Sequence, residues 1–323
     1  IFLTIVIELS INLLKPSIYT SDSELGWKTK KNFDHIFNEK DLYLNKYKSH
    51  YTTDRNGLRV VGENKKNDYK ILVIGDSFTM DKYVGNNEMW FSILSDKISK
   101  FMDRKITVYA GGAGGYSTLQ ELILLERIKN DISPDLFILQ FCDNDFLNNS
   151  LKIEQENYSL SQYMRRPYYD YKNDELYYDD NLYSKIFRIK FINESRVINK
   201  LLFTYEKFLK NYFIKDIKNI DNLIIESEKV TLNLLRKMST LFKDTPKYLF
   251  NCSNKSIIHN RNWKKIALLA DFKILEDSSN LTEESIKYKK KIFYIDGGHL
   301  NILGNDILGN NIFNEIKKDL LIN

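Results

Sequence analysis

Short apolar runs rich in β-branched residues alternate with stretches of helical period through the middle of this chain. The apolar runs are Tyr69–Ile74, Ile106–Ala110 and Asp135–Phe141. The helical stretches between them are Met89–Phe101 and Leu119–Ile128. Near-continuous apolar strands are typical of a parallel sheet buried on both faces, and alternation with helices implies right-handed crossovers.

The alternation stops after the third strand and resumes later. Residues 146–225 contain no clean strand–helix unit, but Arg166–Tyr178 is typical of two short strands around a turn at Lys172-Asn173-Asp174, and Asn199–Tyr212 is predicted to be helical. Further helices are expected at Glu226–Phe242, Trp263–Ala270 and about Asn301–Leu321, and further strands at Lys247–Asn251 and Phe272–Leu275. We therefore predict one three-layer α/β/α domain of the flavodoxin-like type, residues 67–323, with strand order 2-1-3-4-5 and an insertion at about 146–225.

The N-terminal part differs from the rest. Ile1–Leu14 is almost wholly apolar and is stopped by Lys15-Pro16. This run is shorter than the roughly 20 residues that cross a bilayer as a helix. We expect residues 1–20 to be a truncated N-terminal membrane anchor or signal segment; the alternative is an amphipathic helix, because Glu8 interrupts the apolar run. Residues 21–66 show no sustained period and predict an irregular lead-in.

Composition narrows the function classes. The chain has 323 residues with 48 Lys+Arg and 43 Asp+Glu, a net charge of +5, which does not argue for a nucleic-acid partner. Two cysteines exclude a disulfide framework, and the four histidines show no clustered zinc spacing. Gly111–Gly115 does not fit a dinucleotide fingerprint, and there is no phosphate-binding P-loop motif. We expect no cofactor and no metal, which disfavours a flavin- or nucleotide-binding protein of the same fold class.

Polar residues that could take part in catalysis follow the predicted strands. In open parallel sheets, ligands bind beyond the carboxyl ends of the strands. Ser77 follows the first strand, a glycine run follows the second, and Asn144 follows the third. Asp296 and His299 share the loop before the last helix. These groups supply a nucleophile, oxyanion donors, and a base with its orienting acid, which together indicate acyl transfer.

The same residues carry a resemblance to a known family. Ile74-Gly75-Asp76-Ser77-Phe78-Thr79 looks like the first block of the SGNH (GDSL-type) hydrolases. Gly115 matches the glycine of the second block, Asn144-Asp145 the third block, and Asp296-x-x-His299 the fifth. All four occur in the family order, and the matched region runs from about residue 69 to the end.

The resemblance implies a role for each matched residue. Ser77 would be the nucleophile and His299 the general base. Asp296 would accept the other ring N–H of the histidine and fix its tautomer. The backbone N–H groups of Ser77 and Gly115, with the side-chain amide of Asn144, would form the oxyanion hole.

The lead-in resembles one branch of the family, the anchored members associated with cell-surface glycan acylation. The similar segments are Leu25-Gly26-Trp27, residues 52–59, Gly115-Tyr116-Ser117-Thr118 and Arg166-Pro167-Tyr168. We expect a serine-dependent ester hydrolase or O-acyltransferase that acts on a small acyl ester or an O-acylated glycan. The resemblance also implies a membrane-anchored protein whose catalytic domain lies outside the cytoplasm, with a membrane acyltransferase as a candidate partner.

The alternative is a catalytically weak subunit for glycan binding or assembly. Cys142 stands where the family usually has glycine, and tyrosines crowd the insertion, although we favour simple packing of their rings. In extended backbone, Cys142 would point to the same side as Asn144 and restrict the site to a small acyl group such as acetyl. Cys142 and Cys252 end neighbouring strands and could form a bridge, but we favour two independent thiols.

Overall fold

A six-stranded sheet forms the centre of the molecule. The computed structural model describes residues 8, 10, 16–40, 46–157, 159–212, 220–252, 262–281, 291–293 and 299–321. The sheet order is β12-β11-β8-β6-β7-β5, and all neighbours are parallel except the edge strand β5, which is antiparallel to β7. The strands are β5 (Arg59–Val61), β6 (Tyr69–Gly75), β7 (Ile106–Gly112), β8 (Leu136–Phe141), β11 (Lys247–Asn251) and β12 (Lys273–Ile274). The predicted order of the five parallel strands is confirmed.

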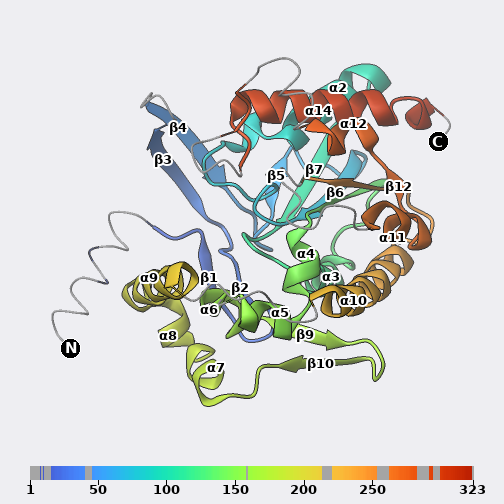
Figure 1. The fold of residues 1–323 in the computed structure, drawn as a ribbon. Helices are drawn as coiled ribbons and strands as arrows, with labels where there is room; N and C mark the ends of the chain where they lie inside the picture. The colour runs from blue at the N-terminus through green and yellow to red at the C-terminus, as the bar shows by residue number, and fades with distance from the viewer. Residues whose placement is uncertain are drawn as a thin grey trace.

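Helices cover both faces of the sheet (Figure 1). One layer contains α2 (Trp90–Met102) and α14 (Ile302–Ile316), and the other contains α3 (Thr118–Ile128), α10 (Ile220–Leu241) and α11 (Trp263–Leu269). Short elements accompany them: η1 (Asn86–Glu88), α12 (Glu276–Ser279) and η2 (Asp319–Leu321). The predicted three-layer α/β/α fold is confirmed.

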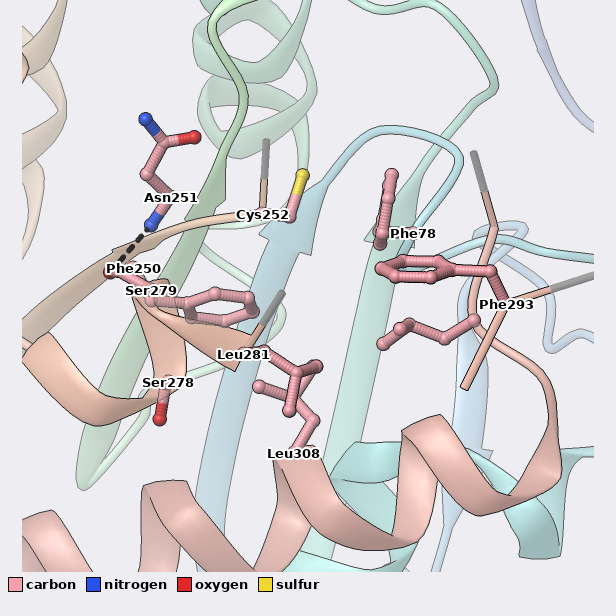
Figure 2. A pocket seen from close by; sticks show the side chains of 10 residues that line it. Phe78, Phe250, Asn251, Cys252, Ser278, Ser279, Leu281, Phe293 and Leu308 are labelled. Atoms are coloured by element: carbon pink, nitrogen blue, oxygen red, sulfur yellow. Dashed lines mark hydrogen bonds between the residues drawn. The ribbon is translucent and has the colours of Figure 1, made fainter. Parts of the chain in front are cut away.

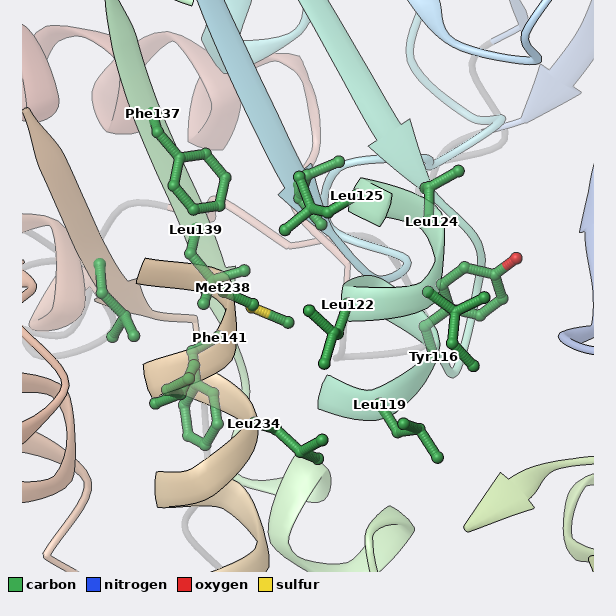
Figure 3. Close-up of a cluster of buried hydrophobic side chains, with 14 of the residues drawn as sticks. Tyr116, Leu119, Leu122, Leu124, Leu125, Phe137, Leu139, Phe141, Leu234 and Met238 are labelled. Carbon is green, nitrogen blue, oxygen red and sulfur yellow. The ribbon is translucent and has the colours of Figure 1, made fainter. Parts of the chain in front are cut away.

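Alternation along the strands distributes side chains between two cores. In β6, Ile71 and Val73 join the cluster under α2 and α14, whereas Leu72 and Ile74 join the cluster under α3 and α10. Figure 3 shows the second cluster, where Phe137 and Leu139 of β8 face side chains from the two helices. Since both faces are buried, the parallel strands are mostly apolar, which is the pattern that predicted them.

Most predicted elements agree with the structure within a few residues. The strand at Lys247–Asn251 matches at both ends, but α10 begins six residues before the predicted Glu226. The last predicted helix divides into α14 and the 3-10 turn η2. Helix ends are set by capping and tertiary contacts, which a periodic pattern does not contain.

The lead-in is not irregular, and the prediction for residues 21–66 was wrong. It contains two antiparallel hairpins, β1 (Tyr19–Asp22) with β2 (Gly26–Thr29) and β3 (Asp34–Lys40) with β4 (Lys46–Thr52). The Asp22 carboxylate caps the first turn by accepting from the backbone N–H of Glu24 and Leu25. These strands are short and half-polar, so no sustained apolar period marks them.

The insertion is fully structured where it is described. Its elements are α4 (Asn144–Asn148), α5 (Leu151–Glu156), α6 (Leu160–Tyr163), β9 (Pro167–Asp170), β10 (Glu175–Tyr178), α7 (Leu182–Phe187), α8 (Lys190–Glu194) and α9 (Arg196–Tyr212). The predicted hairpin and the predicted helix at Asn199–Tyr212 are confirmed. Tyr168 is buried and donates to the Glu154 carboxylate at 2.6 Å, so the favoured interpretation of packed tyrosine rings holds there.

The expected anchor, residues 1–20, lies mostly outside the described residues, apart from Glu8, Ser10 and residues 16–20. Among the helices that the structure describes, none combines the length and the apolar character needed to cross a bilayer.

Candidate active site

The turn that presents Ser77 is held by a buried glutamine. The Gln140 side-chain oxygen accepts from the Asp76 backbone N–H and from the Thr79 hydroxyl, each at 3.0 Å. That oxygen lies 2.3 Å from where a Cβ on Gly75 would stand, so any larger residue at position 75 would displace the Gln140 side chain. Ser77 itself is half-buried at the end of β6. The glycine of the Gly-Asp-Ser motif is therefore required by close packing.

Asp76 is a buried acid beside the nucleophile candidate. It accepts from the Phe78 backbone N–H at 3.0 Å and from the side-chain amides of Gln140 and Asn144. Burial raises the pKa of this carboxyl, while these hydrogen bonds and the electrostatic influence of the nearby His299 oppose the rise. Asp76 thus links the turn of Ser77 to Asn144, a role that sequence reasoning missed.

The loop after β7 is fixed by the lead-in hairpin. The Gly114 N–H donates to the Tyr19 hydroxyl at 2.8 Å, and the Trp27 indole N–H donates to the Gly114 carbonyl at 3.2 Å. Gly115 has φ +73°, a left-handed conformation that favours glycine. A Cβ placed on Gly114 would lie 3.8 Å from the Ser77 Cβ, which puts this loop directly beside the serine.

Two of the predicted oxyanion donors, the backbone N–H groups of Ser77 and Gly115, share one property. Within the part of the chain that the structure describes, neither the Ser77 N–H nor the Gly115 N–H has a hydrogen-bond acceptor. The neighbouring N–H groups of Asp76, Phe78 and Gly114 all have acceptors. Backbone donors left over in this way are suited to a negative charge that develops on a bound ester.

Asn144 opens α4, the first helix of the insertion. Its amide hydrogen-bonds the Asp76 carboxylate, and an amide nitrogen has a second N–H for another acceptor. Asp143 before it has φ −62° and ψ −25°, so the backbone here is helical. The expectation that Cys142 and Asn144 share one side of an extended segment was therefore wrong.

The two cysteines form a disulfide, and the expectation of independent thiols was wrong. Cys142 and Cys252 have a Cα–Cα distance of 5.3 Å at the ends of the adjacent strands β8 and β11. The Gln140 amide nitrogen donates to both sulfurs, at 3.4 and 3.2 Å. Asp76 lies within ligand distance of the sulfurs, but the S–S bond removes the thiolates that a metal ion would need.

His299 lies against the residue that follows Ser77. Its ring centroid is 5.7 Å from that of Phe78, at an angle of 38° between the ring planes. The structure therefore brings His299 to the same end of the sheet as Ser77, Gly115 and Asn144. Asp296 lies outside the described residues, so its predicted role stays a prediction.

A protein-family comparison bears on this arrangement. The model of the GDSL-like lipase/acylhydrolase family matches residues 71–312. The chain belongs to this family. It is therefore an ester-acting enzyme of the acylhydrolase type, and the matched region contains Ser77, Gly115, Asn144, Asp296 and His299. Among curated proteins, none matches the sequence.

The comparison with solved structures lists several esterases. The psychrotrophic esterase EstA from Pseudoalteromonas sp. is 12% identical, with 78% of this chain and 99% of that chain covered and a TM-score of 0.42. The lipase/acylhydrolase from Enterococcus faecalis is 14% identical, with 77% and 96% covered and a TM-score of 0.35. An acetyl-xylooligosaccharide esterase mutant from Geobacillus is 16% identical, with 79% and 95% covered and a TM-score of 0.34.

A pair of buried acids lies beneath the site of this acylhydrolase. Glu121 of α3 is buried, and neither of its carboxylate oxygens has a hydrogen-bond partner among the described residues. Burial, together with the nearby carboxyls of Asp145 and Asp76, raises the pKa of Glu121 well above its ordinary value. Asp145 instead accepts from the Cys142 N–H at 2.9 Å. Burial also raises the pKa of Asp145 well above its ordinary value.

Two of the cavities that the described residues line lie beside the candidate site. The larger is a groove of about 760 Å³ that starts at Gly114 and Tyr19 and is bounded on its far side by α8 and α9. Its lining also includes Trp27, Lys30, Arg165, Asn199, Lys200 and Phe203. The smaller, shown in Figure 2, is an apolar cavity of about 10 Å³ between Phe78, Phe250 and Phe293, with Cys252 at its rim.

Sequence reasoning missed the supporting residues of the acylhydrolase site. Gln140 was visible as the one polar residue in an otherwise apolar strand, and such residues are kept where they have partners. Tyr19 gave no signal, because its use depends on a hairpin that the pattern did not predict. The segment Leu25-Gly26-Trp27 was noticed only as a resemblance to one branch of the family.

Proposed function

We propose that this acylhydrolase uses Ser77 to remove a short acyl group from an O-acylated glycan, or to transfer it to one. The observation that carries the proposal is the pair of unoccupied backbone donors at Ser77 and Gly115, next to the amide of Asn144. These three groups would bind the carbonyl oxygen of an ester as it becomes negative. Removing one such donor typically costs about 2.7–4 kcal/mol in the transition state.

The proposed reaction has two steps, acylation of Ser77 and then deacylation. The Ser77 hydroxyl oxygen attacks the ester carbonyl, and its proton passes to the imidazole of His299. The tetrahedral intermediate collapses, the alcohol leaves with that proton, and the acyl group remains on Ser77. Water or a sugar hydroxyl then attacks the acyl-enzyme, with His299 again taking the proton. The bond between the acyl group and the Ser77 oxygen breaks, the acid or the acylated sugar leaves, and His299 returns the proton to Ser77. Asp296 would stabilise the imidazolium in both steps.

The groove supports a carbohydrate substrate. Aromatic rings of Tyr19, Trp27 and Phe203 line it together with hydrogen-bonding groups such as Asn199 and Lys200. Flat ring faces suit the C–H surfaces of sugars, and the polar groups suit their hydroxyls. A polysaccharide ester at the cell surface, with a membrane acyltransferase as the source of the acyl group, is the finer form of the proposal.

A short acyl group is favoured by the small cavity beside Phe78. Its volume of about 10 Å³ leaves room for about one water-sized group. The sulfur of Cys142 is bonded to Cys252, so it is not the free group that was predicted to restrict the acyl pocket.

The test compares hydrolysis with transfer. Acetyl release from p-nitrophenyl acetate is measured with and without oligosaccharide acceptors, and the acceptors are then analysed by mass spectrometry for added acetyl groups. Ser77→Ala should abolish both activities. Ser99→Ala, a control that removes a hydroxyl group from α2, should retain them. Wild-type protein that binds oligosaccharides but neither turns over the ester nor labels with a fluorophosphonate would favour the weak binding subunit and refute the proposal.

A further inference from the structure

The groove of about 760 Å³ begins at the loop that lies beside Ser77. Gly114 lines its inner end, and a Cβ on Gly114 would lie 3.8 Å from the Ser77 Cβ. Gln162 also lines the groove, and its side-chain amide packs so closely on Gly115 that a Cβ there would collide with it. A molecule bound along the groove would therefore have one end at the candidate oxyanion hole.

Positive charge dominates the lining of this groove. Among the described residues that line it, four are basic and one is acidic: Lys30, Arg165, Arg196 and Lys200 against Glu194. The Glu194 carboxylate accepts from the hydroxyls of Thr20 and Ser21, at 2.7 and 2.9 Å, so the groove wall already engages it. A cleft lined by charges of one sign concentrates ligands of the opposite sign.

Arg165 is held in place by the groove wall. Its guanidinium carbon lies 5.9 Å from the centre of the Trp27 ring, and one guanidinium nitrogen donates to the Asn193 side-chain oxygen at 2.9 Å. The Asn193 amide donates in turn to the Gly26 carbonyl at 2.7 Å. Because Trp27 is itself bonded to Gly114, Arg165 is tied to the loop beside the serine. A guanidinium fixed in this way is suited to a carboxylate or a phosphate, which match its planar donors.

The surroundings of Arg165 favour an anionic ligand. Burial, together with the neighbouring Arg166, lowers the pKa of Arg165 to about 10, so the side chain is still charged at neutral pH. The acid that opposes this shift is Glu206, which forms an ion pair with Lys210 at 2.7 Å. A negative group bound at Arg165 would therefore stabilise a charge that burial and Arg166 destabilise.

Two lysines extend the positive charge along the groove from different parts of the chain. Lys30 follows the lead-in strand β2, and Lys200 belongs to helix α9 of the insertion. Within the described ranges, neither ammonium group forms an ion pair; Lys30 instead lies 5.8 Å from the centre of the Phe33 ring. Arg196 differs, because the nearby Glu8 carboxylate accepts from its backbone N–H at 2.7 Å and offsets its charge. Lys30, Arg165 and Lys200 are thus the cations that can serve a ligand.

We propose that the groove binds a glycan whose sugars carry negative charges, on carboxylate or phosphate groups, and presents one of its acylated sugars to Ser77. This inference rests on the glycan substrate proposed above and names the class of glycan. Arg165 would bind one charged group through two parallel hydrogen bonds, and Lys30 and Lys200 would meet charges on neighbouring sugars. A neutral glycan would displace water from these cations without supplying countercharge, which makes the groove selective.

The experiment measures binding by calorimetry with full-length Ser77→Ala protein, so that ester chemistry does not enter the result. The three ligands are a galacturonate hexamer, maltohexaose, and maltohexaose that carries phosphate groups. At low salt, at least one charged hexamer should bind tenfold or more tightly than maltohexaose, on the order of one charge-assisted hydrogen bond. The preference should shrink at about 1 M NaCl, where the Debye length is about 3 Å. Preference for the galacturonate hexamer identifies carboxylate as the ligand group, and preference for the phosphorylated hexamer identifies phosphate.

Three variants in the Ser77→Ala background locate the binding. Arg165→Gln should raise Kd for the preferred hexamer about tenfold or more, and Lys200→Gln about threefold. Lys97→Gln, which removes the same charge from an exposed position on α2, should leave Kd unchanged. Lys200→Gln keeps the test decisive if Arg165→Gln does not fold.

Equal binding of charged and neutral hexamers would overturn the proposal, as would a Kd that Arg165→Gln and Lys200→Gln leave unchanged. The ester chemistry has a separate readout, turnover of p-nitrophenyl acetate by the wild-type protein. Absent turnover with selective binding of a charged hexamer would refute the acylhydrolase mechanism at Ser77 and leave the charge preference of the groove standing.

Discussion

Removing the bridge between Cys142 and Cys252 should lower stability by a calculable amount. The disulfide closes a chain segment of 110 residues between the ends of β8 and β11. The loop-entropy relation gives about 4.8 kcal/mol of stabilisation for a loop of this length. With an unfolding entropy of about 2.1 cal/mol/K per residue, this corresponds to a fall in Tm of about 7 °C for a 323-residue chain.

The measurement is thermal unfolding of three samples by circular dichroism: oxidised wild type, wild type reduced with a phosphine, and Cys142→Ser/Cys252→Ser. The reduced sample and the double variant should both melt about 7 °C below the oxidised protein. Esterase activity should also fall on reduction, because Asn144 lies two residues beyond Cys142 and Gln140 contacts both sulfurs. Equal melting temperatures, or two titratable thiols in unreduced unfolded protein, would refute the reasoning.

Three further predictions concern the site and the acids below it. Asn144→Ala should lower kcat/KM for acetyl and butyryl p-nitrophenyl esters by a similar factor, about a hundredfold, since the oxyanion is common to both; a loss confined to one ester would contradict this. Tyr19→Phe leaves the Gly114 N–H without its acceptor and should destabilise the protein by about 1–3 kcal/mol in urea unfolding while reducing kcat; unchanged values would show that the contact is unimportant. Glu121 has a raised pKa in the folded state, so its protonated form supports the fold at low pH and that support is lost as pH rises. Glu121→Gln should therefore gain stability relative to wild type as the pH rises above the ordinary pKa of a glutamate, by up to about 1.4 kcal/mol per pH unit, and a difference that is constant with pH would exclude this role.

Local periodicity explains which parts of the fold were predictable. The strands β6, β8 and β11 are buried on both faces, so most of their residues are apolar and these runs can be recognised in the sequence. The candidate residues follow these strands immediately, which is why Ser77 and Asn144 could be named without a structure.

Other features depend on contacts that are distant in sequence. The bond between Cys142 and Cys252 requires the strand register and a helical turn after β8, neither of which the pattern specifies. The hydrogen bond from the Gly114 N–H to the Tyr19 hydroxyl joins residues that are 95 positions apart in the sequence. It requires a hairpin whose strands have only four residues each. The hydrogen bonds that Gln140 accepts from Asp76 and Thr79 likewise join residues that are distant in sequence.

The most direct test of the account is the site of covalent modification. A fluorophosphonate should add to the Ser77 hydroxyl, so peptide mapping by mass spectrometry should find the adduct on the tryptic peptide 71–82, and labelling should block turnover of p-nitrophenyl acetate. Ser77→Ala should melt as wild type does and show neither labelling nor turnover. An adduct on a different peptide, or turnover that survives in Ser77→Ala, would contradict the assignment of Ser77 as the nucleophile.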